Sequence, residues 1–140
     1  MFKRVLFVCT GNTCRSPQAE AIFNRIATDG LIAKSAGTHT IDGINADWNV
    51  IDVMKERNID LNNHKSQLIT EDLIIEADNI YCLTKSHYDY LINKFPKYKD
   101  KIATLADEDI MDREVTTREG YRDLLSKIEE AVTKIIEEIT

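Results

Sequence analysis

Along this chain of 140 residues, continuous runs of apolar residues alternate with segments in which apolar residues recur every three to four positions. Residues 3–9 contain an apolar run that ends at Cys9, and such a run is typical of a central parallel strand covered on both faces. Residues 31–36, 79–84 and 101–105 are three further short apolar segments, and we predict a strand in each. Between these segments the apolar positions follow the 3.6-residue period of amphipathic helices.

Helix boundaries follow from capping residues and breakers. The first helix is expected to begin at Ser16 as its cap, with Pro17 in its first turn, and to end near Gly30. Thr116 and Glu119 have the spacing of a capping box at the start of the last helix, whose apolar stripe runs for more than five turns. The predicted helices span residues 16–29, 46–57, 70–77, 86–95 and 116–139.

This alternation predicts the fold class. Strands that alternate with helices form a parallel sheet with right-handed crossovers, so we expect a flavodoxin-like α/β sheet of about four parallel strands with helices on both faces. No linker, repeat or low-complexity tract interrupts residues 1–140, which predicts one domain. Ligands of such sheets bind beyond the carboxyl ends of the strands, and Cys9 ends the first strand.

Composition and charge narrow the function classes. Hydrophobic residues make up 43% and charged residues 30% of the chain, as in an ordinary globular domain. The formal net charge of −6 disfavours a nucleic-acid partner, because nucleic-acid binders usually carry a basic face. No apolar run approaches the roughly 20 residues of a membrane span, and residues 1–4 lead directly into a strand, so we expect neither a membrane association nor a signal peptide. Three cysteines, an odd number, argue against a disulfide framework and favour the cytoplasm.

The segment after the first strand has the composition of an anion-binding loop. Cys9 and Arg15 are separated by five residues, and the loop between them leads into a helix N-terminus, where amides and the helix dipole attract anions. A thiol in that field should ionise readily, and the arginine can grip two phosphate oxygens. Gly11 and Asn12 suit the backbone turns of such a loop, and Ser16 can hydrogen-bond the Cys9 sulfur.

This loop resembles the signature of the low-molecular-weight protein-tyrosine-phosphatase family, Cys-x-Gly-Asn-x-Cys-Arg-Ser. A second tripeptide of that family occurs at residues 35–37, and the resemblance covers nearly the whole chain. It implies the same fold, phosphorylated proteins as substrates, and Cys9 as a nucleophile that forms a cysteinyl-phosphate intermediate, with Arg15 stabilising the transferred group. The implied phosphate-binding loop consists of Thr10, Gly11, Asn12, Thr13, Cys14, Arg15 and Ser16.

The resemblance also implies a general acid. The family places it in an Asp-Pro step on a loop before the final helix, whereas here Asp112 is followed by Arg113. Asp112 lies nine residues before Tyr121, a separation that resembles bacterial members, and we therefore assign it as the acid. Asp109 is the rival, and loss of the proline should loosen this loop.

The second cysteine of the loop suggests redox protection. In the family, a cysteine at the position of Cys14 can form a disulfide with the nucleophile under oxidation. The resemblance therefore implies a Cys9–Cys14 pair in oxidised protein.

Other chemically capable residues are given structural roles. Cys82 lies within a predicted strand and is expected in the core, and Trp48 is expected to be partly buried as a packing residue. His39, His64 and His87 lack metal-ligand spacing, so we expect no metal and no other cofactor. We interpret His64 and His87 as helix-capping or surface groups.

Thr13 bears on the substrate. Many tyrosine-directed relatives have isoleucine there, which suits a phenyl ring, whereas relatives that act on phosphoarginine resemble this chain. The acidic residues 106–115 suit a cationic group, and the expected pocket rims, residues 38–44 and 113–115, contain no aromatic residue. These features favour a protein-arginine phosphatase, with phosphotyrosine as the alternative substrate.

Two other functions remain as rivals. An arsenate reductase of the same fold needs two further thiols after the third strand, where this chain has Cys82 and then Thr84. A phosphopeptide-binding module without activity would need no thiol, so Cys9 together with Arg15 and a loop aspartate argues against it. The oligomeric state and the physiological substrate stay open.

Overall fold

The carboxyl ends of four parallel strands form the edge of the sheet that carries the predicted site. The computed structural model describes residues 3–28, 30–112 and 114–140. The strands are β1 (Lys3–Cys9), β2 (Leu31–Gly37), β3 (Asn79–Cys82) and β4 (Ile102–Thr104). They pair in parallel in the order β2-β1-β3-β4, the order of a flavodoxin-like doubly wound sheet, which confirms the predicted fold class.

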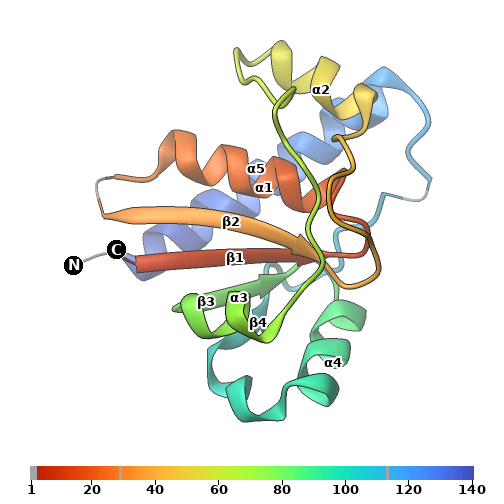
Figure 1. Ribbon diagram of the computed structural model, residues 1–140. Helices are drawn as coiled ribbons and strands as arrows, with labels where there is room; N and C mark the ends of the chain where they lie inside the picture. Colours follow the sequence, from red (N-terminus) through yellow and green to blue (C-terminus); the bar gives the residue numbers. More distant parts are fainter. Residues whose placement is uncertain (1–2, 29, 113) are drawn as a thin grey trace.

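Helices cover both faces of this sheet (Figure 1). Helices α1 and α5 lie on one face, α3 and α4 lie on the other, and α2 packs against α5. A 3₁₀ helix, η1, follows α4 and was not predicted from the sequence. The bounds are α1 (Arg15–Ile26), α2 (Trp48–Lys55), α3 (Glu71–Glu76), α4 (Lys85–Lys94), η1 (Pro96–Lys101) and α5 (Arg118–Ile139).

Burial of β1 on both faces explains its unbroken apolar run. Phe7 points to the side of α1 and α5, where its ring packs edge-to-face on Phe23 at 5.8 Å between centroids. Leu6 points to the opposite core, which it shares with Ile74 of α3 and Leu91 of α4. The central strand is therefore fixed from both sides, and so is the position of Cys9 at its end.

The first helix differs from the prediction at both ends. Ser16 is not its cap: it lies inside α1 and is fully buried, whereas Cys14 precedes the helix without a capping side chain. The helix ends at Ile26 because Ala27 has extended backbone angles, before the predicted stop at Gly30. Ser16 is therefore free for another partner, which lies in the site.

Two other local predictions were also wrong. The cap of α5 is Thr117, whose hydroxyl accepts a hydrogen bond from the Gly120 amide at 3.0 Å, so Thr116 lies outside the helix. Trp48 begins α2 with 71% of its surface exposed and is not a packing residue. Short patterns predict the helices themselves, but not which of two neighbouring threonines faces the helix end.

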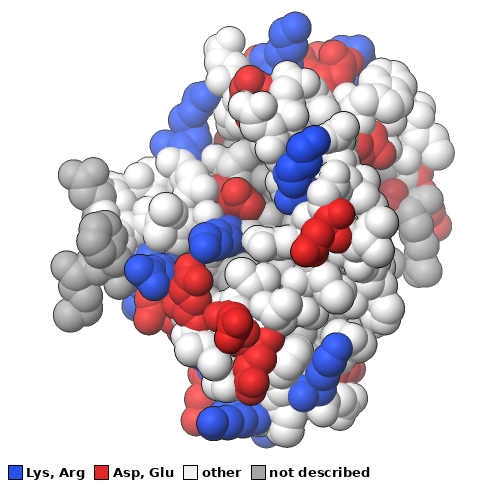
Figure 2. All heavy atoms as spheres, viewed as in Figure 1, with Lys and Arg blue, Asp and Glu red and all other residues white. Residues whose placement is uncertain are grey.

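Charged side chains of both signs lie on the face that Figure 2 displays, and acidic and basic side chains are mixed over it. Among the described helices, none combines the length and the apolar character that crossing a bilayer requires.

Candidate active site

The loop between β1 and α1 lies at the point where the strand order reverses, because β1 pairs with β2 on one side and β3 on the other. Within the described parts of the chain, none of the backbone N–H groups from Thr10 to Cys14 donates a hydrogen bond to a protein acceptor. These N–H groups are followed directly by the N-terminus of α1. Unpaired loop amides at a helix N-terminus form an anion-binding site.

The Cys9 sulfur lies at the base of this loop and is buried. Its Sγ atom is 2.8 Å from Ser16 Oγ, and Ser16 Oγ accepts a hydrogen bond from Asn12 Nδ2, also at 2.8 Å. Because the serine oxygen receives the amide proton, its own hydroxyl proton is available to donate to the sulfur. This arrangement stabilises a negatively charged sulfur.

Asn12 holds the loop in shape. Its φ of 57° lies in the left-handed region, which asparagine tolerates better than most residues. Its Oδ1 accepts from the Gln67 amide at 2.9 Å, which fixes the orientation of the side-chain amide, and its Nδ2 also donates to Ser35 Oγ at 2.9 Å. The carbonyl of Asn12 pairs with His64 Nε2 at 2.7 Å, so His64 supports the loop and is neither a cap nor a surface group.

Gly37 allows the end of β2 to approach the loop. A Cβ atom at this position would lie 2.6 Å from the carbonyl oxygen of Thr10 and 3.2 Å from Cβ of Asn12. No side chain fits at that distance from a backbone oxygen. The family tripeptide at residues 35–37 therefore has a physical reason: it supplies the Ser35 hydroxyl and a close backbone approach.

Arg15 is nearly fully buried beside the loop. Its Nη1 donates to the carbonyl of Ile110 at 3.0 Å, and its Nε lies 3.3 Å from Oδ2 of Asp112. That ion pair is not a hydrogen bond: the buried Nε has no acceptor among the described residues. A buried donor without an acceptor is unfavourable, and a phosphoryl oxygen would satisfy it.

The two candidate acids have different surroundings. Asp112 is about two-thirds buried and lies against Arg15 and Cys14. Asp109 instead accepts a hydrogen bond from the Lys85 amide at 2.8 Å, at the start of α4. The geometry thus brings Asp112 to the loop and occupies Asp109 elsewhere, while Arg113, where the family has proline, lies outside the described residues.

The remaining cysteines differ from Cys9. Burial and the neighbouring Asp112 carboxylate raise the pKa of Cys14 far above its ordinary value, so it is a neutral thiol at physiological pH. Burial raises the pKa of Cys82 to about 12. Cys82 lies in β3 within the core, as predicted.

His87 is a residue whose place sequence reasoning missed. It is 6% exposed, so it is not a surface group, and its Nε2 is 2.8 Å from Oγ1 of Thr10. The two residues are 77 positions apart, and no local pattern could have indicated the contact. Across the described residues, no group of three His, Cys, Asp or Glu side chains is arranged to hold a metal ion.

Aromatic residues lie closer to the loop than the sequence suggested. Trp48 follows Asp47, whose amide donates to the Thr13 carbonyl at 2.8 Å, and it shares a surface hollow with Tyr121. Burial raises the pKa of Tyr121, and the neighbouring Asp47 and Cys14 raise it further. The sequence predicted a pocket rim without aromatic residues because residues 38–44 and 113–115 contain none. Trp48 and Tyr121 lie outside these two segments, and that prediction did not take them into account.

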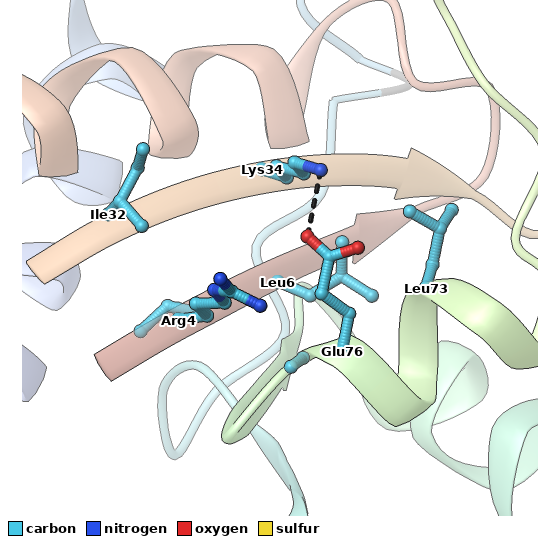
Figure 3. Close-up of a pocket in the computed structure, with 8 residues that line it drawn as sticks. Arg4, Leu6, Ile32, Lys34, Leu73 and Glu76 are labelled. Carbon is cyan, nitrogen blue, oxygen red and sulfur yellow. Dashed lines mark hydrogen bonds and ion pairs between the residues drawn. The ribbon is translucent and has the colours of Figure 1, made fainter. Parts of the chain in front are cut away.

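A second hollow lies on the sheet face near the amino end of β1 (Figure 3). It measures about 320 Å³, and apolar side chains such as Leu6 and Leu73 line it. An ion pair between Lys34 and Glu76, 2.9 Å long, lies across it. Its lining contains no cysteine, serine or histidine, so the chemistry lies at the opposite end of the strand.

Comparison with known proteins agrees with the geometry. A model of the family described as "Low molecular weight phosphotyrosine protein phosphatase" matches residues 4–140. A protein-arginine-phosphatase of Geobacillus stearothermophilus is 36% identical over 97% of this chain and 95% of its own length. The crystal structure of a low molecular weight protein tyrosine phosphatase from T. tengcongensis superposes with a TM-score of 0.92 at 35% identity, covering 97% of this chain and 99% of that one.

A third relative has another activity. An arsenate reductase of Staphylococcus aureus is 41% identical, but over only 58% of this chain and 60% of its own. The full-length matches are phosphatases, in agreement with the loop and its buried arginine. The chain therefore belongs to the low molecular weight phosphotyrosine protein phosphatase family, whose members are cysteine-dependent protein phosphatases.

Proposed function

We propose that this protein hydrolyses phosphorylated side chains through a cysteinyl-phosphate intermediate on Cys9, and that phosphoarginine is its preferred substrate. The observation that carries the mechanism is the convergence of the Cys9 sulfur, the Ser16 hydroxyl and a row of unpaired loop amides at one helix N-terminus. A phosphoryl group seated on those amides lies against the sulfur. No other cysteine in the described residues has such surroundings.

The first step transfers the phosphoryl group to sulfur. The Cys9 thiolate attacks phosphorus, the bond from phosphorus to the leaving nitrogen or oxygen breaks, and Asp112 donates its proton to the leaving atom. Arg15, anchored by the Ile110 carbonyl, stabilises the charge on the transferred oxygens. The support for Asp112 is its place beside the loop, where its Oδ2 lies 3.3 Å from Arg15 Nε.

The second step releases phosphate. The Asp112 carboxylate takes a proton from water, the water oxygen attacks phosphorus, and the sulfur–phosphorus bond breaks. The departing thiolate accepts the Ser16 hydroxyl proton as a hydrogen bond, and the Asn12 amide keeps that hydroxyl in the required orientation. Cys9 and Asp112 therefore serve both steps.

The substrate preference is supported by Thr13 and by the relatives. Thr13 has a hydroxyl where an aliphatic side chain would pack on a phenyl ring. Its Oγ1 lies 3.6 Å from the position that a Cβ atom on Gly11 would occupy. Full-length relatives from Geobacillus stearothermophilus and Bacillus subtilis, 36% and 33% identical, are named protein-arginine-phosphatases. Residues 106–115, which follow the carboxyl end of β4, are mainly acidic and would also attract a guanidinium group.

Phosphotyrosine is the second candidate substrate because of two aromatic residues. Trp48 is 71% exposed next to the loop, and Tyr121 lies near Cys14. Exposed aromatic rings beside a phosphate site can stack on a phenyl group. Arsenate reduction has no comparable support, because Cys82 is buried in β3 and residue 84 is a threonine.

A paired assay tests the proposal. We expect kcat/KM for a phosphoarginine peptide to exceed that for a phosphotyrosine peptide of matched sequence. Thr13→Ile should reverse the order of the two kcat/KM values. The substitution removes the hydroxyl and adds apolar surface, which favours the phenyl ring. If the unmodified protein prefers phosphotyrosine, the substrate assignment is wrong while the mechanism stands. Consumption of thioredoxin thiols with arsenate would instead establish the reductase.

A further inference from the structure

We propose that Thr10, held in place by His87, is a second specificity-determining residue, which favours a guanidino substituent on the phosphoryl group over an aryl substituent. The inference rests on the proposed function and adds a residue to it. The predicted loop included Thr10 only for its amide. In the structure its side chain is exposed at the carboxyl end of β1, directly after Cys9, and has a buried partner.

His87 is a fixed support for that side chain. Its Nδ1 is 3.0 Å from Oγ1 of Thr84, and the same oxygen accepts from the backbone amide of His87 at 3.2 Å. Thr84 is the cap of α4 and is itself buried, so the imidazole is held at the start of a helix that packs on the sheet. The remaining ring nitrogen, Nε2, points to Thr10 Oγ1 at 2.8 Å.

The backbone of Thr10 has little freedom either. Its carbonyl accepts from the His39 amide at 2.9 Å, and Gly37 approaches it so closely that no Cβ would fit. The His39 ring contacts Tyr90 of α4 in a tilted arrangement, with 4.9 Å between the ring centroids. Rotation about the side-chain bond is the freedom that Thr10 retains, and the bond to His87 restricts it.

Proton counting shows what Thr10 offers to a substrate. Burial and the positive Arg15 lower the pKa of His87 to about 4, against the opposing effect of Asp109 and Asp112 and with a further lowering from His39, so the imidazole is neutral at physiological pH. One ring nitrogen then donates and the other accepts. If Nε2 donates, Thr10 Oγ1 keeps one lone pair and its proton; if Nε2 accepts, Oγ1 keeps two lone pairs. In both cases a hydrogen-bond acceptor remains on Thr10.

A guanidino group can use that acceptor and a phenyl group cannot. The N–H groups of phosphoarginine need acceptors close to the phosphorus, and Thr10 and Thr13 provide hydroxyl oxygens on the same loop. An aryl group would cover the Thr10 hydroxyl without replacing its hydrogen bond to water, which is unfavourable. The discrimination should show in the ratio of kcat/KM for phosphoarginine to kcat/KM for phosphotyrosine.

The experiment measures this ratio on matched peptides for five variants and their parent. Thr10→Val removes the hydroxyl at nearly constant shape and should lower the ratio about tenfold, the effect of one lost hydrogen bond. Thr10→Ser keeps the hydroxyl and should restore most of it. His87→Leu should lower the ratio to a similar extent, but have little effect when added to Thr10→Val, because His87 acts through Thr10. Thr28→Val, the same change at an exposed threonine after α1, at the end of the sheet opposite to Cys9, is the matched control and should leave the ratio unchanged.

Thermal unfolding of His87→Leu shows whether this variant folds. If it does not, His87→Gln replaces it in the comparison. The glutamine retains a hydrogen-bond donor and should keep the ratio of kcat/KM values closer to that of the parent. If Thr10→Val and the His87 variants change both substrates equally, the pair has only a structural role and the inference is wrong. If the parent hydrolyses neither peptide, the proposed function fails instead.

Discussion

The two loops that meet at Cys9 are held in very different ways. The phosphate loop, residues 10–14, is fixed by side-chain contacts to three other segments, through Ser35 of β2, His64 and Gln67 between α2 and α3, and His87 of α4, and its Asn12 is completely buried. In the described part of the acid loop, residues 106–112 and 114–117, Asp109 accepts from the Lys85 amide and Asp112 pairs with Arg15. The backbone of this loop is held at Ile110, whose amide donates to the Leu83 carbonyl and whose carbonyl accepts from Arg15. The next residue, Met111, is 42% exposed.

This difference agrees with the two tasks. A phosphoryl group has one size and one charge pattern in every substrate, so the loop that binds it can be rigid, and preorganised donors act without reorganisation. The acid has to deliver its proton to different leaving atoms and later take one from water. A loop with fewer contacts of this kind can adjust to both. We therefore expect substitutions of Cys9 and of Asn12, which holds the phosphate loop in shape, to affect all substrates, and substitutions of the acid to have effects that depend on the leaving group.

The largest effect should come from the nucleophile. Cys9→Ser should lower kcat by roughly 10⁴–10⁶-fold on every substrate, the range found when other enzymes lose a covalent-catalysis residue. Intact-protein mass spectrometry of the acid-quenched parent should detect a phosphoryl adduct, and peptide mapping should place it on Cys9. An adduct on another residue, with unchanged thermal unfolding of the variant, would disprove the mechanism.

The acid loop should show a smaller effect that depends on the substrate. Asp112→Asn should lower kcat about 10²–10⁴-fold on phosphopeptides and much less on p-nitrophenyl phosphate, whose leaving group needs no proton. Asp109→Asn is the control: an asparagine oxygen can still accept from the Lys85 amide, so activity should change little. A larger loss from Asp109→Asn than from Asp112→Asn would reverse the assignment of the acid.

The free energy of unfolding should distinguish the two loops without any substrate. Asn12→Gly permits the same left-handed backbone but leaves the Gln67 amide and two serine hydroxyls without their partner, which should cost on the order of 2–4 kcal/mol. Met111→Ala, at a partly exposed position of the acid loop, should cost below about 1 kcal/mol. Urea unfolding followed by circular dichroism measures both. Equal losses would show that the acid loop is as strongly fixed as the phosphate loop.

The smallest effect concerns recovery from oxidation. Peroxide should convert Cys9 to a sulfenic acid, and the neutral Cys14 thiol should then form a disulfide with it, releasing water. A reductant should restore the activity of the oxidised parent. It should not restore the activity of oxidised Cys14→Ser, in which the Cys9 sulfur is oxidised beyond the sulfenic acid. Absence of a Cys9–Cys14 peptide from the oxidised parent would exclude this protection.

Sequence patterns predicted those parts of the structure that depend on residues close together in the sequence. The run at residues 3–9, the helical periods and the spacing of Cys9 and Arg15 are local signals, and they led to the strands, the helices and the loop. The supporting residues could not be found in this way. His64 and His87 reach the loop across 52 and 77 residues of sequence, and only the paired strands bring them there.

Smaller errors had a common origin. Ser16 and Thr116 each have the sequence of a helix cap, but the Cys9 sulfur engages the first, and Thr117 takes the place of the second. The exposure of Trp48 depends on which face of α2 meets α5. In each case tertiary contacts decided between local alternatives that the sequence left equivalent.

The dispersed support of the phosphate loop has a consequence for truncated chains. The carbonyl that anchors Arg15 belongs to Ile110, which lies 95 residues further along the sequence. A chain cut before Ile110 keeps the whole segment from Cys9 to Ser16 but loses this anchor, so we expect its arginine to be poorly positioned. The loop sequence alone is therefore not sufficient to build the site.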